Sequence, residues 1–161
     1  MRIEEVYRLI ESPEDGTFAG AKLSGKSIDK LYKFVQKNNI PNPVERKDYH
    51  STILFSRVPL KNYKPAGIYK PPLTGKAIGV KMLGKEKDSL VVLLDSPDLV
   101  KRHERLMKEN PEATWDFPEF IPHVTLAYDV EGFDPSPLNA TTIGELEFVE
   151  EYTEDIDPDW N

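Results

Sequence analysis

The order of the expected secondary structure elements repeats once along this chain. Each half reads as strand, helix, proline-rich approach, histidine-bearing strand, loop and strand. His50 and His123 lie 73 residues apart, and the same shift carries the strand expected at residues 17–23 onto the third strand. Halves of about 70 residues are too small to bury separate cores, so we expect them to pack together as one domain. The pattern predicts an α+β fold with two pseudo-symmetric lobes of antiparallel sheet, flanking helices and a cleft between the lobes.

Hydrophobic runs and turn residues place the strands. We expect them at residues 17–23, 50–56, 73–83, 89–95, 123–128 and 142–152. Four prolines make residues 57–72 a long ordered loop, because proline has no backbone N–H to give to a sheet ladder.

Two helices are expected between these strands. Ser27 is the expected N-cap of the first, over residues 27–38, because a serine side chain can accept a hydrogen bond from the first turn. Ser96 should cap the second helix, with Pro97 in its first turn. His103 lies on this second helix and has no threonine two residues later, so we expect a structural role for it.

Length and composition set the outer limits. The 161 residues suit a single domain, with lobe one at about 17–84, lobe two at about 89–155 and a C-terminal tail at 153–161. The net charge of −7 argues against binding to long nucleic acid, although a few cations can dominate a small cleft. Cysteine is absent, no apolar run could span a membrane, and the acidic N-terminus does not look like a signal peptide. We therefore expect a cytoplasmic protein with no membrane partner.

Two strands carry the same short motif, a histidine followed two residues later by a threonine. His50 and Thr52 lie on the second expected strand, and His123 and Thr125 lie on the fifth. Side chains two residues apart on a strand point to the same face, so each strand projects one imidazole and one hydroxyl. The repeat should set the two strands side by side, and the four side chains should then surround one space.

Such a set of side chains suits phosphodiester cleavage. One neutral imidazole can take a proton from the attacking oxygen, and the other, as imidazolium, can protonate the leaving oxygen. The threonine hydroxyls can donate to the non-bridging oxygens, where negative charge builds in the transition state. The chemistry needs neither a metal ion nor another cofactor.

The paired motifs resemble the two-histidine phosphoesterase superfamily, which includes RNA 2′,3′-cyclic phosphodiesterases and viral 2′,5′-oligoadenylate phosphodiesterases. Three proline-containing stretches, at residues 40–46, 62–67 and 118–123, are similar to a narrower family, the anti-CBASS phosphodiesterases of tailed phages. This resemblance covers most of the chain, from about Thr17 to the C-terminus.

The resemblance implies a specific activity. Such enzymes degrade the cyclic di- and trinucleotides, such as cyclic GMP-AMP, that bacteria make to signal infection. They cut 3′–5′ linkages with the substrate's own 2′-hydroxyl as nucleophile. Carried over to this chain, one of His50 and His123 is the base and the other the acid, while Thr52 and Thr125 hold the phosphate. Nothing in the sequence decides which histidine is which.

The resemblance also implies residues that bind the substrate. Phe18 stands where an aromatic side chain contacts a base in such enzymes. A glutamate of the last strand is expected near the substrate, and Glu151 has the better spacing from His123, with Glu147 as its rival. Trp160 resembles a tail aromatic that covers the site, from the same chain or from a neighbouring subunit of a homo-oligomer.

Two other functions remain open at this point. One is a phosphodiesterase that acts on RNA 2′,3′-cyclic ends or on 2′,5′-oligoadenylates. The other is a sponge that binds cyclic nucleotides without cutting them. A sponge needs no matched acid and base, so the two intact motifs favour an enzyme.

Overall fold

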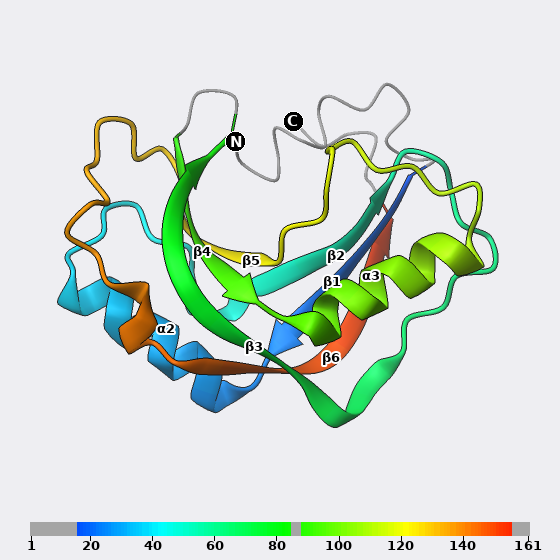
Figure 1. The fold of residues 1–161 in the computed structure, drawn as a ribbon, viewed down its shortest axis with the longest axis horizontal. Helices are drawn as coiled ribbons and strands as arrows, with labels where there is room; N and C mark the ends of the chain where they lie inside the picture. Colours follow the sequence, from blue (N-terminus) through cyan, green and yellow to red (C-terminus); the bar gives the residue numbers. More distant parts are fainter. Residues whose placement is uncertain (1–15, 85–87, 156–161) are drawn as a thin grey trace.

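The computed structural model describes residues 16–84 and 88–155. In these residues, one curved sheet holds six strands in the order β2-β1-β6-β3-β4-β5 (Figure 1). The strands are β1 (Thr17–Leu23), β2 (His50–Ser56), β3 (Gly67–Leu83), β4 (Ser89–Asp95), β5 (His123–Ala127) and β6 (Glu145–Asp155). The helices are α2 (Gly25–Lys37), α3 (Pro97–Glu109) and the short 3-10 helices η2 (Arg46–Asp48) and η3 (Ala140–Thr142). Within the described ranges, no helix has the length and apolar character needed to cross a membrane.

The strand order is symmetric about its centre. The 73-residue shift relates β1 to β4, β2 to β5 and β3 to β6, so the order reads the same from either edge. Each half of the chain sends its last strand to the middle of the sheet, where β3 and β6 pair with each other. On its other side β3 pairs with β4, and β6 pairs with β1. The expected α+β fold with two pseudo-symmetric lobes of antiparallel sheet is confirmed, and the two lobes exchange their third strands.

The two edge strands, β2 and β5, lie against each other. Figure 1 shows β5, in yellow, running beside β2, and the two strands are in contact. Backbone hydrogen bonds from the segment just before β2 hold the two edges of the sheet together. The Val44 N–H donates to the Leu126 carbonyl at 2.8 Å, and the Tyr128 N–H donates to the Asn42 carbonyl at 3.3 Å. The curvature of the sheet therefore brings both histidine strands together from its opposite edges.

The face of the sheet opposite the histidines forms the core. On β2 and β5 the residues between each histidine and threonine, Ser51 and Val124, are fully buried on that face. Helices α2 and α3 contribute their apolar side chains to the same core, namely Leu31, Phe34, Val35, Leu99 and Leu106. The half-buried histidines and threonines of β2 and β5 lie on the other face.

The N-cap of helix α2 (Gly25–Lys37) lies three residues earlier than the sequence suggested. Ser24, not Ser27, is the N-cap, and its side chain accepts a hydrogen bond from the Ser27 N–H at 3.2 Å. The Ser27 hydroxyl instead accepts from the Glu147 N–H of β6 at 2.7 Å. Both serines suit an N-cap, and only this contact with a distant strand separates them, so the prediction for Ser27 was wrong.

Helix α3 follows its prediction. Ser96 is the N-cap and accepts from the Leu99 N–H at 3.1 Å, and Pro97 stands in the first turn. Here the serine and the proline are adjacent, so the sequence offers only one starting point.

Strand β3 begins at Gly67, inside the stretch of residues 57–72 that was expected to be a loop. Its ladder with β6 is interrupted between Ile68 and Leu73, and the two prolines of the strand lie in this break. The two prolines therefore stand where β3 makes no ladder pairs with β6, and their missing N–H groups cost no hydrogen bond of that ladder. The prediction of a loop was wrong for residues 67–72, because it treated every proline as incompatible with a strand.

The last strand begins at Glu145, three residues later than expected. The residues before it form η3, which Asn139 caps by accepting a hydrogen bond from the Thr141 N–H at 3.2 Å. An asparagine cap of this kind competes with an extended conformation.

A buried ion pair joins β6 to α3 and β3. The Glu151 carboxylate accepts two hydrogen bonds from Arg102, at 2.7 and 2.9 Å. It also accepts from the hydroxyls of Tyr63 and Tyr69, each at 2.8 Å, and from the Ala66 N–H at 2.9 Å. Burial alone would raise the pKa of Glu151, but these hydrogen bonds hold that pKa below its usual value. The group stays ionised, and the network holds the centre of the sheet to α3.

We predict that Glu151→Ala strongly destabilises the fold. The substitution leaves Arg102, whose side chain is 18% exposed, without its carboxylate, and removing one partner of a buried pair costs about 3–5 kcal/mol. Glu109→Ala is the matched control, because Glu109 pairs with Arg105 on the exposed face of α3 at 3.5 Å. That change should cost less than about 1 kcal/mol. Urea unfolding followed by circular dichroism measures both, and equal stability of the two variants would contradict the structural role.

Candidate active site

The two histidines are held in the same way in each half of the chain. His50 Nδ1 lies 2.9 Å from the Asp48 carbonyl, and His123 Nδ1 lies 2.8 Å from the Ile121 carbonyl. A carbonyl only accepts hydrogen bonds, so each Nδ1 carries the proton. In the neutral form each Nε2 therefore keeps a free lone pair. Both rings are ready to exchange a proton with a ligand at the same atom.

The strands present a threonine beside each histidine. Thr52 and Thr125 are half-buried and share the face of His50 and His123, while the residues between them point into the core. Among the described residues, neither threonine hydroxyl has a hydrogen-bond partner. Because β2 and β5 meet at the closed edge of the sheet, the four predicted side chains lie on adjoining strands.

Phe18 supports His50 instead of lying open to a base. It is only 1% exposed, and its ring meets the His50 ring edge-on with centroids 5.8 Å apart. A side chain with so little surface offers none to a nucleobase in this conformation. The expectation that Phe18 contacts a base therefore does not fit its surroundings, and its ring packs against the His50 ring instead.

Tyr152 of β6 is a residue of this site that the sequence analysis missed. It pairs in register with Gly20 of β1, and its ring lies 6.3 Å from His50 and 5.8 Å from Phe18. A Cβ on Gly20 would come within 3.0 Å of the Tyr152 hydroxyl, so the glycine makes room for the phenol. Lys22 places its Nζ 4.9 Å from the ring centroid. Gly20 inside a strand was the available signal, because such a glycine often marks a close approach.

Comparison with known proteins agrees with this geometry. The family model described as "Anti-CBASS protein Acb1" matches residues 15–161. The chain is 40% identical over 152 residues to the anti-CBASS protein Acb1 of Acinetobacter phage Ac42, covering 91% of this chain and 95% of that one. It is 32% identical over 147 residues to that of Enterobacteria phage T4, covering 90% and 91%. This chain belongs to the Acb1 family.

The fold of this Acb1 family member is similar to solved phosphoesterases. A crystal structure of a phosphoesterase matches with a TM-score of 0.61 at 17% identity, covering 86% of each chain. Escherichia coli LigT complexed with 3′-AMP matches with a TM-score of 0.59 at 18% identity, again over 86% of each chain. At this identity the likeness establishes the fold, which is that of the two-histidine phosphoesterases. Family and fold together make the chain a phosphodiesterase.

The two glutamates expected near the substrate lie on different faces of β6 in this Acb1 structure. Glu151 faces the core, where its carboxylate is fully occupied by the network with Arg102. Glu147 was expected on the same face as Glu151. A bulge at Val149 interrupts the pairing of β6 with both of its neighbours, and the two glutamates fall on opposite faces. The expectation for Glu151 came from its spacing from His123, and in this conformation the bulge places its side chain in the core.

Other candidates are placed as follows. His103 lies in the core, stacked on Phe120 at 4.2 Å, with its Nδ1 2.7 Å from the Ile53 carbonyl, so its expected structural role is confirmed. Trp160 and the rest of the tail beyond Asp155 lie outside the described residues. The half-buried Glu147 stays a prediction.

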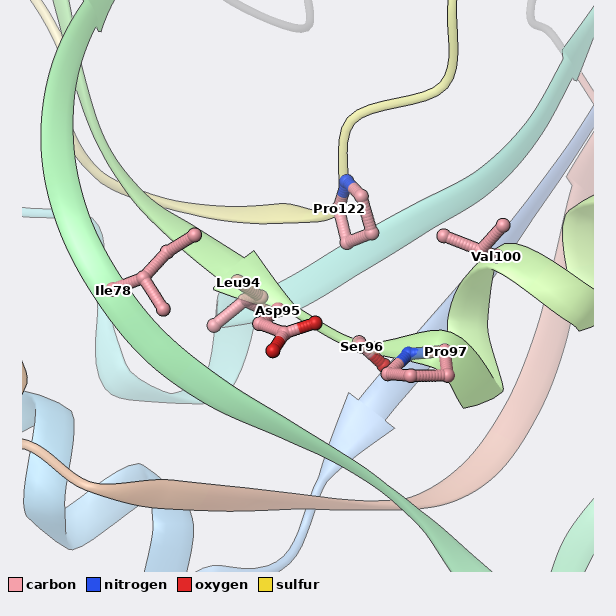
Figure 2. A pocket seen from close by; sticks show the side chains of 7 residues that line it. All are labelled: Ile78, Leu94, Asp95, Ser96, Pro97, Val100 and Pro122. Carbon is pink, nitrogen blue, oxygen red and sulfur yellow. The ribbon is translucent and has the colours of Figure 1, made fainter.

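Figure 2 shows a groove beside the strand that carries His123. Its volume is about 400 Å³, and it is lined by Ile78, Leu94, Asp95, Ser96, Pro97, Val100 and Pro122. It has one carboxylate and no cation in its lining, which does not suit a phosphate. None of the two histidines and two threonines of the Acb1 motifs lines this groove.

No metal site accompanies the histidines in the described ranges. Across residues 16–84 and 88–155, no three histidine, aspartate or glutamate side chains are grouped closely enough to hold a metal ion.

The two histidines differ in their charged surroundings. Burial lowers the pKa of His50, but the hydrogen bond to the Asp48 carbonyl and the carboxylates of Glu154 and Asp48 oppose this shift. Burial also lowers the pKa of His123, the Ile121 carbonyl opposes it, and the charge of His50 lowers it further. When the two histidines together bind one additional proton, that proton therefore favours His50.

We predict that this difference is visible by NMR titration of the three histidines. His50 and His123 should both titrate below pH 6.5, because burial disfavours their charged forms. At pH 6.5 most of the folded protein should therefore hold both rings neutral. Glu154→Gln removes a negative charge that favours the His50 imidazolium, so the pKa of His50 should fall further.

His103 is the internal control, since it lies in the core and Glu154 does not influence its pKa. A His50 pKa that rises or stays constant in Glu154→Gln, or an equal change at His103, would contradict the assignment.

Proposed function

We propose that this chain hydrolyses the 3′–5′ linkages of cyclic di- and trinucleotide immune signals, such as cyclic GMP-AMP, without a metal ion. The observation that carries the proposal is the pair of imidazoles on adjoining strands, each with Nδ1 anchored to a carbonyl and Nε2 free. The Acb1 relatives support a role against CBASS defence. In this role the protein acts in the cytoplasm of the infected bacterium and lets the phage evade that defence.

The chemistry uses the two histidines in opposite protonation states. A neutral Nε2 removes the proton of the ribose 2′-hydroxyl, and the 2′-oxygen attacks the neighbouring phosphorus. The other histidine, as imidazolium, protonates the 5′-oxygen as its bond to phosphorus breaks. The products are a 2′,3′-cyclic phosphate and a free 5′-hydroxyl. In a second step the roles reverse, and water opens the cyclic phosphate to a 3′-phosphate.

The surroundings of the histidines suggest how the roles divide. Asp48 and Glu154 favour the charged form of His50, so we assign the acid of the first step to His50 and the base to His123. Thr52 donates a hydrogen bond to a non-bridging oxygen, where negative charge grows in the transition state. Thr125 of β5 donates a hydrogen bond in the same way.

Net charge and the paired motifs argue against the alternatives. A net charge of −7 disfavours the binding of long RNA but does not argue against the binding of a dinucleotide. A sponge has no need of two anchored imidazoles with matching threonines. We also propose that the tail residue Trp160 covers the substrate, from the same chain or from the neighbouring subunit of a homo-oligomer.

We predict that the substrate's 2′-hydroxyl is required. In buffer with EDTA, a cyclic diribonucleotide should give a 2′,3′-cyclic phosphate and then a 3′-phosphate, because the attack is intramolecular and needs no captured water. Its 2′-deoxy counterpart should bind comparably and remain uncut. Anion-exchange chromatography of the products separates these outcomes. Equal cleavage of both compounds would mean direct attack by water, and binding of both without cleavage would mean a sponge.

We predict that His50→Ala and His123→Ala each lower turnover by roughly a hundred- to ten-thousand-fold while binding is largely kept. The double variant should be little worse than either single one, because the two residues act as a unit. Ser51→Ala is the matched control within the same motif. Its hydroxyl is buried on the opposite face and makes no hydrogen bond, so the control should keep both stability and turnover.

Single-turnover rates and equilibrium binding measure these effects separately. Near-normal turnover in either histidine variant would refute the paired mechanism.

A further inference from the structure

A tyrosine hydroxyl lies among the catalytic side chains with no assigned task. Across the first half of the sheet, Thr52 of β2 pairs with Gly20 of β1, and Gly20 pairs with Tyr152 of β6. These three residues form a row on the face that carries His50. A Cβ on Gly20 would meet the Tyr152 hydroxyl at 3.0 Å, so the phenol end of the ring lies over Gly20 and next to the strand of Thr52.

The ring is held from several sides, but its hydroxyl is not. Phe18 and His50 lie 5.8 and 6.3 Å from the Tyr152 ring centroid, and the Lys22 Nζ lies 4.9 Å from it. Among the described residues, no group donates a hydrogen bond to this hydroxyl or accepts one from it. Half-buried phenols usually find a partner, so an unoccupied hydroxyl in a reaction site suggests that the partner is the ligand.

The phenol is kept in its protonated form. Burial, Glu154, Asp48 and Tyr128 all raise the pKa of Tyr152 above its ordinary value. The group is therefore a hydrogen-bond donor throughout the range in which a histidine pair works.

The repeat does not explain the tyrosine. In the second half of the sheet, Thr125 of β5 pairs with Val91 of β4, and Val91 pairs with Lys81 of β3, so Val91 and Lys81 stand where the first half has Gly20 and Tyr152. The second half of the sheet therefore has no aromatic ring at the corresponding place. Because the two halves have the same architecture, the ring is a one-sided addition that the fold itself does not need.

We propose that Tyr152 is a further catalytic residue, whose hydroxyl donates a hydrogen bond to a non-bridging oxygen of the scissile phosphate on the Thr52 side. The inference rests on the proposed function, since it needs a phosphodiester held between the two histidine strands. A preorganised donor at this oxygen gains strength as negative charge develops there in the transition state. Gly20 is required because any larger residue would displace the phenol.

The test is Tyr152→Phe, which keeps the ring and its contacts and removes only the hydroxyl. With a cyclic diribonucleotide, kcat should fall about a hundredfold while KM changes little, as expected when a donor acts mainly on the transition state. Tyr32→Phe on α2, whose ring lies under the Arg46 guanidinium at 4.3 Å, is the matched control and should keep wild-type rates. Thermal melting should show the same stability for both variants.

Phosphorothioate substrates separate a direct contact from a structural effect. Sulfur accepts hydrogen bonds poorly, so the wild-type protein should be slowed when sulfur replaces the contacted oxygen in one diastereomer. Tyr152→Phe has already lost that contact, and its rate penalty for the same diastereomer should be much smaller.

An unchanged kcat in Tyr152→Phe, or a reduced kcat with the wild-type penalty for both diastereomers, would overturn the proposal while the proposed function stands. A wild-type protein that leaves the cyclic diribonucleotide uncut would overturn both, and this is seen before any variant is made.

Discussion

The pairing of β3 with β6 at the centre of the sheet is the contact on which the site depends. Each strand belongs to one half of the chain and completes the sheet of the other half. The three strands of either half therefore do not form a continuous sheet by themselves. The complete sheet is continuous from β2 to β5. Curvature of this single sheet then brings its edges together. The two histidines meet because they stand on equivalent edge strands of a symmetric order, although 73 residues separate them.

The sequence predicted the four motif residues because their positions depend only on local alternation within one strand. His50 and Thr52 are two residues apart, and no bulge falls between them. The orientations of the β6 side chains were harder to predict, because one extra residue at Val149 changes which face of the sheet the following residues occupy. Counting from His123 along the sequence selected Glu151, whereas the bulge turns Tyr152 toward the site. Such a bulge depends on both neighbouring strands and has no local signature in this chain.

Other errors also came from contacts between distant segments. Ser24 and Ser27 are equally good helix caps by sequence, and a hydrogen bond from β6 to Ser27 decides between them. The burial of Glu151 follows from Arg102, which reaches it from α3 with two hydrogen bonds. From the sequence alone, the run of carboxylates near the C-terminus suggests a solvated segment. Only the position of Arg102 in the structure explains why Glu151 is buried. The fold class and the meeting of the two histidine strands could be predicted from the sequence, whereas the residues that surround the histidines could not.

Symmetry alone would give this site two equivalent histidines, and a reaction that needs an acid and a base must distinguish them. The backbone treats both rings alike, since each Nδ1 meets the carbonyl two residues earlier. The difference comes from the neighbours of His50, which include two carboxylates that favour its charged form. The carboxylates near His50 therefore make the two rings electrostatically unequal. The repeat accounts for the paired geometry, and the residues around each histidine account for the difference between the two.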